Sequence, residues 1–344
     1  MPSIHTIYAG RTIYNGYKNA FTDLGFEFKT LTPSDNIEKK FCEFKPDIFL
    51  TGLSSYFLKY LDLNLIKEHK KRGMKVFVSM PIWNSPVSKL RINETPSLSQ
   101  NIEHINLIKS GEFGDVYYNV CEQNDERMSG FEEMTGYKHY TIPLAADKII
   151  LKSEYDKKFQ SDISYIGTYL PAKRDFFKKC VFPLKKKYDL KLYGQDWDFF
   201  DRMLGWVQRG GQYFNLPYLR SIRKPRLKLE DEGKIYNSSL ISINIHEDYQ
   251  REFGADCNER TFKIPLCGGF EITDDVACIR KYFKEGEEII IAKNDKEWFE
   301  KIDYYIKYPE KRLPIIEAGR KKVLADHTYH NRVTQIVSIY NLIK

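Results

Sequence analysis

The sequence predicts an α/β protein of two domains, each built from a parallel sheet wrapped by helices. At 344 residues the chain exceeds the size at which a single hydrophobic core usually stops growing. Both halves alternate short β-rich runs with helical patterns, as parallel sheets with crossover helices require. A charged, loop-like stretch, LKSEYDKKFQ at 151–160, separates the two series. We therefore expect domains at 1–155 and 156–344.

The first half carries the signals of a Rossmann-like domain. Its β-branched and aromatic runs are each short enough to be one strand, and amphipathic stretches lie between them. The expected strands are 5–9, 27–31, 47–51, 75–80, 115–120 and 139–143, and the expected helices are 16–24, 37–44, 63–72 and 101–110. This alternation is typical of βαβ units.

The second half repeats the pattern and ends in helices. Strands are expected at 163–167, 190–194, 240–246, 269–273 and 288–292. The last part, 296–344, predicts three helices that cap the second sheet, with breaks at Pro309 and at the turn His327-Thr328-Tyr329. In proteins with two such domains the final helix often returns to the first domain, and we expect the same here.

The composition is that of a globular protein. Hydrophobic residues make up 42% and charged residues 29%, and no run approaches the roughly 20 continuous apolar residues of a membrane span. The start, MPSIHTIYAG, lacks the basic segment and apolar run of an export signal. The six cysteines have no C-x-x-C spacing, which argues against a zinc site and a disulfide framework. We therefore expect a soluble, cytoplasmic protein without a metal.

The net charge of +7 comes partly from three basic clusters. KEHKKR at 67–72 and the lysines at 178–187 lie at the ends of expected helices, where cations complement the helix dipole. The third cluster, RSIRKPRLK at 220–228, has poor periodicity and can hold phosphates or another anionic partner. Binding to nucleic acid thus stays open.

The first candidate site follows the strand at 163–167. Ligands of open α/β sheets bind at the carboxyl ends of the strands. Here the strand runs into Gly167 and Thr168, and a helix then opens with two cations, the second being Arg174. Backbone amides at a helix start together with an arginine suit a diphosphate. The alternative is a tight turn before an exposed basic helix.

A second candidate site lies in the segment 258–274. It reads as a helix from near Asn258 to a double glycine, Gly268-Gly269, followed by a buried strand. The amino-terminal end of this helix directs its dipole and amides to the strand ends, where Arg260 and Thr261 can hold phosphate oxygens. Gly268 can equally serve only as the helix cap.

His246, at the end of the strand 240–246, is a third candidate. A histidine at a strand end is by itself more often structural than catalytic. However, His246 flanks the phosphate-binding helix together with Glu252 and Asp256. We therefore expect these three residues to contact the sugar and to take part in catalysis.

These segments form an ordered set that resembles a known family. The matching stretches are PLAAD at 143–147, SDISYIG at 161–167, Arg174, LYG at 192–194 with Trp197, YNSS at 236–239, INIH at 243–246, RTF at 260–262, CGGF at 267–270 with Thr273-Asp274, and HTY at 327–329 with Arg332. In this order, over roughly 143–340, the chain resembles the CgeB-like (spore-maturation) glycosyltransferases of the GT-B fold.

The resemblance implies two facing Rossmann-like domains with a helical cap. It also implies a metal-independent enzyme without a cofactor, with the nucleotide-sugar donor in the C-terminal domain and a hydroxyl acceptor, such as a glycan, a protein or a cell-surface or spore polymer, contacted mainly by the N-terminal one. Donor-binding candidates are Gly167, Thr168, Arg174, Gly194, Arg260, Thr261, Lys263, Gly268 and Gly269.

Lys263 departs from the family pattern. Related GT-B enzymes carry a glutamate at this position to hold the ribose hydroxyls of the nucleotide. A lysine donates hydrogen bonds but accepts none, so it cannot hold both hydroxyls in the same way. Either the ribose is held differently, or Lys263 pairs with a phosphate, or donor binding is altered.

The N-terminal half offers acceptor-binding candidates only through its predicted strand-end loops. These are 10–12, with Arg11, 54–56, and 81–85, with Trp83 and Asn84. Trp83 suits stacking on a sugar face, although an aromatic residue in a loop is as often part of local packing.

Three functions remain open from the sequence. Transfer of a sugar from a nucleotide-sugar to a hydroxyl acceptor is the leading reading. The second is a non-catalytic carbohydrate-binding or spore-coat protein on the same fold, which Lys263 favours. The third is a DNA-modifying glycosyltransferase, which the segment 220–228 favours. The sequence does not identify the donor sugar, the nucleotide base, the acceptor, the general base or the stereochemical outcome.

Overall fold

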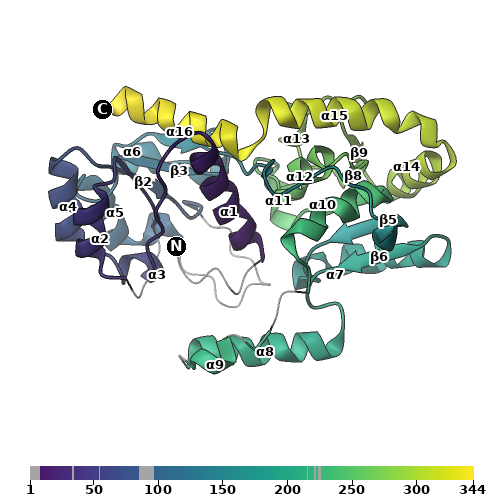
Figure 1. Cartoon of the computed structure of the whole chain (residues 1–344), viewed down its shortest axis with the longest axis horizontal. Helices are drawn as coiled ribbons and strands as arrows, with labels where there is room; N and C mark the ends of the chain where they lie inside the picture. The colour runs from purple at the N-terminus through teal and green to yellow at the C-terminus, as the bar shows by residue number, and fades with distance from the viewer. Residues whose placement is uncertain are drawn as a thin grey trace. The chain divides into compact units, whose positions relative to one another are not determined.

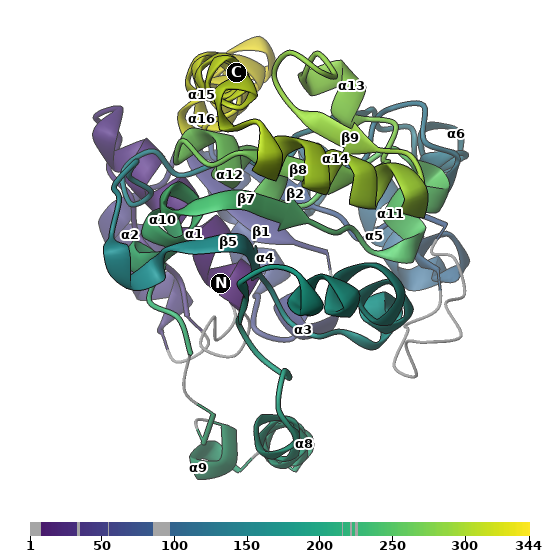
Figure 2. The same cartoon turned by 90° about the vertical axis from the view of Figure 1, so that its right-hand side faces the viewer.

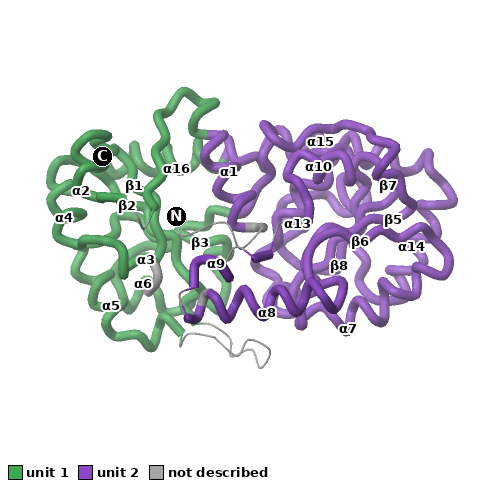
Figure 3. The backbone as a smooth tube through the Cα atoms, turned by 60° about the horizontal axis from the view of Figure 1, so that its bottom comes forward, with its two compact units in different colours: residues 1–4, 21–143, 332–344 green, residues 5–20, 144–331 purple. Residues whose placement is uncertain are grey.

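The computed structural model describes residues 8–32, 35–53, 55–84, 97–214, 216–220, 222–223 and 226–344, which form two compact units (Figure 3). Unit 1 comprises 21–143 and 332–344, and unit 2 comprises 8–20 and 144–331. The chain thus changes unit at 143/144, before the predicted boundary at 155/156. The physical reason is that Ala146 pairs with the turn at 327–329, donating to His327 O and accepting from Tyr329 N, both at 3.0 Å.

Unit 1 contains a parallel four-stranded sheet in the order β1-β2-β3-β4, of which Figure 1 labels β2 and β3. Its strands are β1 (Ile48–Gly52), β2 (Lys75–Ser79), β3 (Val116–Asn119) and β4 (His139–Thr141). Its helices are α2 (Ile37–Phe44), α3 (Ser55–Leu58), α4 (Leu63–Lys71), α5 (Ile102–Lys109) and α6 (Phe131–Thr135). Buried side chains on both faces of β2, among them Val76, Phe77 and Val78, fit a sheet covered on two sides.

Two predicted strands of the first half are wrong as far as they are described. Tyr8 and Ala9 belong to helix α1 (Tyr8–Asp23), and the rest of the expected strand 5–9 lies outside the described residues. Thr12, Gly16 and Ala20 are buried at a spacing of four, which is a helical period. Residues 27–31 have no regular structure.

Unit 2 contains a parallel five-stranded sheet in the order β6-β5-β7-β8-β9, of which Figure 2 labels every strand but β6. The strands are β5 (Ser161–Ile166), β6 (Leu190–Tyr193), β7 (Ser239–Asn244), β8 (Glu271–Asp274) and β9 (Ile290–Ala292), so all five predicted strands are confirmed. Because the connection direction reverses at β5, the carboxyl ends of β5 and β7 form the switch point at which such sheets bind ligands.

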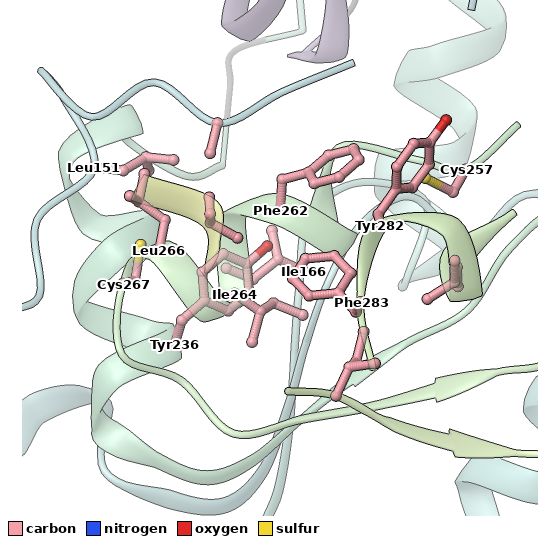
Figure 4. Close-up of a cluster of buried hydrophobic side chains, with 14 of the residues drawn as sticks. Leu151, Ile166, Tyr236, Cys257, Phe262, Ile264, Leu266, Cys267, Tyr282 and Phe283 are labelled. Carbon is pink, nitrogen blue, oxygen red and sulfur yellow. The ribbon is translucent and has the colours of Figure 1, made fainter. Parts of the chain in front are cut away.

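Helices cover unit 2's sheet through two apolar clusters. One cluster includes Tyr236, Phe262 and Ile264 (Figure 4), and the other includes Phe177 and Trp298. The helices of this unit before the C-terminal region are α7 (Arg174–Phe176), α8 (Phe199–Tyr213), α9 (Pro217–Arg220), α10 (Leu229–Ser238), α11 (Asp248–Phe253), α12 (Arg260–Leu266) and α13 (Ile279–Tyr282).

The C-terminal region forms the three predicted helices α14 (Asp295–Lys307), α15 (Leu313–Asp326) and α16 (Tyr329–Ile343). Residues 332–344 of this region belong to unit 1, so the predicted return of the last helix is confirmed. Two side chains fasten it there: Arg332 Nε donates to Pro143 O and Gln335 Nε2 donates to Thr141 O, both at 2.9 Å. None of the helices that the structure describes is long and apolar enough to span a membrane.

Candidate functional site

Two glycines bring the ends of β5 and β6 together beside the switch point. Gly167 N donates to Tyr193 O at 2.9 Å. Gly194 has a φ of +118°, and a Cβ atom there would lie 2.4 Å from Gly167 O. No larger residue fits this approach without a shift of the backbone. Both predicted glycines therefore shape the sheet edge.

Lys173 reaches across the switch point. It follows β5, in the 3₁₀ turn Pro171–Lys173, and its Nζ donates to Ile245 O beyond the end of β7 at 2.9 Å. The side chain is buried, at 4% exposure. Burial, and next to it the charge of Arg260, lower the pKa of Lys173 to about 7. The sequence showed a cation at this position but gave no sign of its burial.

Arg260 meets Lys173 at the same carbonyl group. The arginine opens helix α12, and its Nη2 donates to Ile245 O while its Nε donates to Asn244 Oδ1, both at 3.0 Å. Its guanidinium also lies over the ring of Tyr165, 5.3 Å from the centroid. Two cations from different elements thus converge at the carboxyl ends of β5 and β7, as predicted for Arg260.

Arg174 and Thr168 lie on the connection between β5 and Lys173. The Arg174 guanidinium lies 5.3 Å from the centroid of the Tyr169 ring, and its buried Nε has no hydrogen-bond partner among the described residues. Thr168 is half-buried, and its carbonyl accepts from Leu170 N at 2.8 Å. A buried N–H group without a partner is suited to donate a hydrogen bond to an incoming anion.

Asn244, at the end of β7, aims Arg260. Its Oδ1 accepts from Arg260 Nε and from Asn258 Nδ2 (2.9 Å). Its Nδ2 donates to Thr261 Oγ1 at 3.0 Å and to Glu271 Oε1 at 2.8 Å. Burial raises the pKa of Glu271 to about 8, so this carboxyl group is mostly protonated at neutral pH. Sequence reasoning did not assign Asn244, whose only signal was a polar residue closing a buried strand.

His246 and Thr261 are enclosed in the protein rather than open to a substrate. Both have 0% exposure. Burial lowers the pKa of His246 although Asp274 opposes this, so the ring is neutral, with Nδ1 donating to Asp274 Oδ1 at 2.6 Å. Its Nε2 then accepts from the Thr261 hydroxyl at 3.3 Å, and that oxygen accepts from Asn244. The direct contacts of His246 with sugar and of Thr261 with phosphate stay predictions, and in the structure both side chains hold their neighbours in place.

Asp274, which accepts a hydrogen bond from His246, is kept in its ionised form. Burial alone would raise its pKa, but His246 and Arg251 hold the pKa of this carboxyl well below its usual range. Arg251 Nη1 donates to Asp274 Oδ2 at 2.9 Å and to His246 O at 3.0 Å. These hydrogen bonds hold the residues that follow β7 in place.

Lys263 pairs with two carboxylates. Its part in donor binding, for which a phosphate partner is one of the three alternatives named above, stays a prediction. Its Nζ lies 2.9 Å from Glu259 Oε2 and 3.6 Å from Glu232 Oε1, and all three side chains are buried. Glu259 also accepts from the hydroxyls of Thr12 and Tyr329. Glu259 and Glu232 thus supply, next to this position, the hydrogen-bond acceptor oxygens that a lysine side chain lacks.

Gly268 and Gly269 end helix α12 at its far end from the cations. Gly268 has a φ of +72°, and a Cβ atom there would lie 2.8 Å from Ser153 Oγ. A Cβ atom at Gly269 would lie 2.9 Å from Tyr236 O. Both glycines thus serve the helix end and its packing, and their role in donor binding stays a prediction.

Glu252 and Asp256, the other two predicted catalytic residues, differ in their exposure to solvent. Glu252 is exposed on α11. Asp256 is buried, and its Oδ2 accepts from Gln250 Nε2 at 2.8 Å. Their proposed catalytic roles remain predictions.

The three residues predicted to bind the acceptor, Trp83, Asn84 and Arg11, also lie in different environments. Trp83 is fully buried, with its ring edge-on to Phe131 at 5.2 Å, so it belongs to the core and cannot stack on a sugar. Asn84 Nδ2 donates to Ser129 O at 2.9 Å. Arg11 lies on α1, within unit 2, and not in a loop of the N-terminal sheet as predicted. Ser54 and Ser85 lie outside the described residues.

In the basic segment 220–228, Arg223 and Arg226 form ion pairs with aspartates of the same chain. Arg223 Nη2 donates to Asp196 Oδ1 at 2.6 Å, and its Nε donates to Asp201 Oδ1 at 3.0 Å. Arg226 Nη1 donates to Asp198 Oδ2 at 2.6 Å. These pairs weaken the prediction that this segment holds phosphates.

The arrangement as a whole gathers positive charge at the carboxyl ends of the strands of unit 2. Buried Lys173 and half-buried Arg260 converge where β5 and β7 end, Asn244 orients Arg260, and Gly167 and Gly194 keep the ends of β5 and β6 close. Two units with parallel sheets, the second with a switch point, have the architecture of the GT-B fold.

Comparisons with known proteins agree with this fold. Residues 174–338 match the family model described as glycosyl transferase-like. The chain is 23% identical to the spore protein CgeB of Bacillus subtilis over 222 residues, which cover 60% of this chain and 62% of that protein's length. The resemblance to the CgeB-like glycosyltransferases that the sequence predicted is thus confirmed.

Solved structures show the same fold at low identity. An alpha-glucosyltransferase in complex with UDP is 12% identical, with a TM-score of 0.65 over 99% of this chain and 98% of that one. A glycosyltransferase from Rickettsia africae is also 12% identical, with a TM-score of 0.56 over 95% of this chain and 87% of that one. Sucrose-phosphate synthase from Thermosynechococcus elongatus is 11% identical, with a TM-score of 0.55 over 89% and 76%. The predicted GT-B fold is confirmed.

Proposed function

We propose that the protein transfers a sugar from a nucleoside-diphosphate-sugar to a hydroxyl acceptor, and that the diphosphate binds at Lys173 and Arg260. The observation that carries this proposal is the convergence of these two cations on Ile245 O. They come from opposite sides of the switch point, where sheets of this kind hold ligands. Arg174, with its unpartnered Nε, is the third cation that we assign to the diphosphate.

The chemistry follows from where charge develops. The bond between the sugar and the diphosphate oxygen breaks, the acceptor oxygen forms the new bond, and its proton is lost. Negative charge grows on the leaving diphosphate, and donors fixed before the reaction stabilise that charge without reorganising. Asn244 fixes Arg260 in this sense. Lys173, with a pKa of about 7, takes up a proton when the anion arrives.

We propose that the reaction needs no metal and no cofactor. Three cationic side chains can neutralise the diphosphate at the place where other enzymes use a divalent ion. Turnover that is unchanged by EDTA is the expected result, and loss of turnover restored by Mg²⁺ would contradict it. We also place the reaction in the cytoplasm, since thiols suit a reducing compartment and no disulfide joins the cysteines of the described residues.

The decisive test is Lys173→Met, with Lys178→Met as the matched control. Lys178 is an exposed lysine on the same connection. Calorimetry against UDP-, GDP-, TDP- and CMP-sugars should find one donor that the wild type and Lys178→Met bind and that Lys173→Met binds at least about tenfold more weakly. Arg260→Ala should lose binding similarly. Removing a buried cation should leave the unfolding midpoint equal or higher, because that charge is costly to bury.

The pH dependence separates this role from a structural one. A diphosphate diester keeps its charge between about pH 6 and pH 9, so the protein's own groups set the profile. Affinity should be constant below the pKa of about 7 and fall as pH rises above it, because neutral Lys173 loses the attraction. Lys173→Met should show a flat profile. Donor binding without turnover on any hydroxyl acceptor would favour a non-catalytic carbohydrate-binding protein, and no binding of any donor would overturn the proposal.

A further inference from the structure

The described residues of the range 196–228 form an excursion from unit 2 between β6 and α10. Helices α8 and α9 pack against each other and stand away from the sheet of this unit (Figures 1 and 2). The end of the excursion is tied back to its start, because Arg223 bonds to Asp196 and Asp201, and Arg226 bonds to Asp198. The Arg223 side chain is only 8% exposed. The excursion is therefore a defined element rather than a loose loop.

The outward face of α8 is apolar. Phe199, Phe200, Met203, Trp206 and Val207 are all exposed, with Phe200 at 61% and Trp206 at 57%. Their spacing of three and four residues places them on one stripe of the helix. The polar side chain of Asp201 is instead buried on the opposite side. The usual orientation of an amphipathic surface helix is thus reversed.

The stripe is part of a concentrated patch. Of the 22 exposed large hydrophobic residues in the described part of the chain, nine fall within 199–218. Single exposed apolar residues are normal, but a contiguous group marks a surface that is covered in use. Tyr213 and Phe214 extend the patch beyond the stripe.

The same excursion is strongly basic. Residues 196–228 contain seven lysines and arginines and three aspartates, so their formal charge is 7 − 3 = +4 of the whole chain's +7. Arg202 and Arg209 lie on α8 itself, beside the stripe. The occupant must therefore accept apolar side chains and carry negative charge.

We propose that this excursion, residues 196–228, docks onto the surface of an anionic lipid bilayer. Helices with phenylalanine and tryptophan on one face and arginine or lysine beside them bind in the plane of the interface, where acyl chains meet headgroups. Anionic headgroups attract each nearby cation. A second copy of the chain would bring its own +4 to the patch and repel it. A nucleic-acid duplex would meet the cations but leave the aromatic stripe in water.

This inference stands apart from the proposed glycosyl transfer, because it needs neither donor nor turnover. The probe is a set of vesicles of phosphatidylcholine, with and without about 30% phosphatidylglycerol, mixed with the full chain. Co-sedimentation should require the anionic lipid and weaken with salt. Tryptophan emission should shift to the blue, because Trp206 is exposed, whereas Trp197 is half-buried and Trp83 and Trp298 are buried.

The test variant is Phe200→Ser combined with Trp206→Ser. The matched control is Ile102→Ser combined with Leu342→Ser, two hydrophobic residues that are 71% and 83% exposed elsewhere. Vesicle binding should fall at least about tenfold in the first variant and be unchanged in the second, with equal unfolding midpoints because exposed side chains contribute little to the core. Arg202→Gln with Arg209→Gln should lessen the preference for anionic lipid.

Four results would overturn the inference. In the first, the wild-type protein stays in solution with both kinds of vesicle, and in the second, the stripe and control variants bind vesicles equally. In the third, the wild type forms a concentration-dependent dimer that only the stripe variant loses. In the fourth, the wild type binds duplex DNA and only the stripe variant loses that binding. The last two would assign the patch to a second copy or to nucleic acid. Donor binding, measured on the same variants, should not change.

Discussion

Lys263 illustrates how a single position takes its meaning from its neighbours. The resemblance to GT-B enzymes implies a glutamate that binds ribose hydroxyls at this position, and here the chain has a lysine. Glu259 and Glu232 lie beside its ammonium group, at 2.9 and 3.6 Å, inside the protein. A buried charge is stable only when it is paired. The lysine is therefore required by two carboxylates, whatever its role toward the donor.

Restoring the family residue alone, with Lys263→Glu, should destabilise the protein by about 3–5 kcal/mol, since it leaves three buried carboxylates together. Urea denaturation at pH 7 measures this loss. The deficit should shrink toward acid pH, where the carboxylates become protonated. Lys322→Glu is the control: this lysine pairs with Asp326 at the same i,i+4 spacing on the surface, and its loss should cost below about 1 kcal/mol. Equal losses in the two variants would show that Lys263 is not a buried pair.

Among the elements, β5 and β6 meet where the donor site is proposed, and their approach depends on glycine. Trp197 Nε1 donates to Gly167 O at 2.9 Å and so adds to the bond between Gly167 and Tyr193. A wider gap would displace the turn that carries Lys173. The geometry of the strand ends and the position of the cation are thus linked through the backbone.

Gly194→Ala should therefore destabilise the protein more than its conformation alone explains. Gly73→Ala is the matched control, because Gly73 has a similar φ of +107° and nothing within 4 Å of its would-be Cβ. The control should lose about 1 kcal/mol from the positive φ. Gly194→Ala should lose about 2 kcal/mol more, because its Cβ meets Gly167 O at 2.4 Å. Chemical denaturation of both variants decides, and equal losses would refute the close approach.

At the scale of the whole molecule, the chain passes between its two units three times within the described residues, at 20/21, 143/144 and 331/332. The last passage places most of α16 in unit 1. Val333, Ile336 and Ile339 on this helix are buried. Each unit therefore depends on a segment distant from it in sequence.

Removing Arg332–Lys344 should consequently destabilise unit 1, although most of that unit precedes residue 144. Burial of three aliphatic side chains stabilises by several kcal/mol, at about 1.5–3 kcal/mol each. Hydrogen exchange of β1 to β4 should accelerate, and proteolysis should cut 21–143 earlier. Removing only 342–344, where Leu342 is exposed, is the control and should have no effect. Unchanged exchange in the longer deletion would contradict this assignment of α16.

Much of unit 2 was predictable because its strands are short buried runs bounded by glycines and polar turns. All five strands and the three C-terminal helices followed from local pattern alone. Unit 1 was less predictable at its start, where 5–9 and 27–31 have the composition of strands. There, burial at Thr12, Gly16 and Ala20 favours a helix for the first segment. Local propensity does not contain such long-range partners.

By itself the sequence determined the two α/β units, the resemblance to the CgeB-like glycosyltransferases, and the placement of Arg260 and the glycines at strand ends. The tertiary structure alone decided which polar residues are enclosed. It buried Lys173 beside Arg260, locked His246 onto Asp274, moved Trp83 into a core and paired Lys263 with two carboxylates. Periodicity along the chain sets strands and helices, whereas burial and pKa depend on partners that only folding brings near.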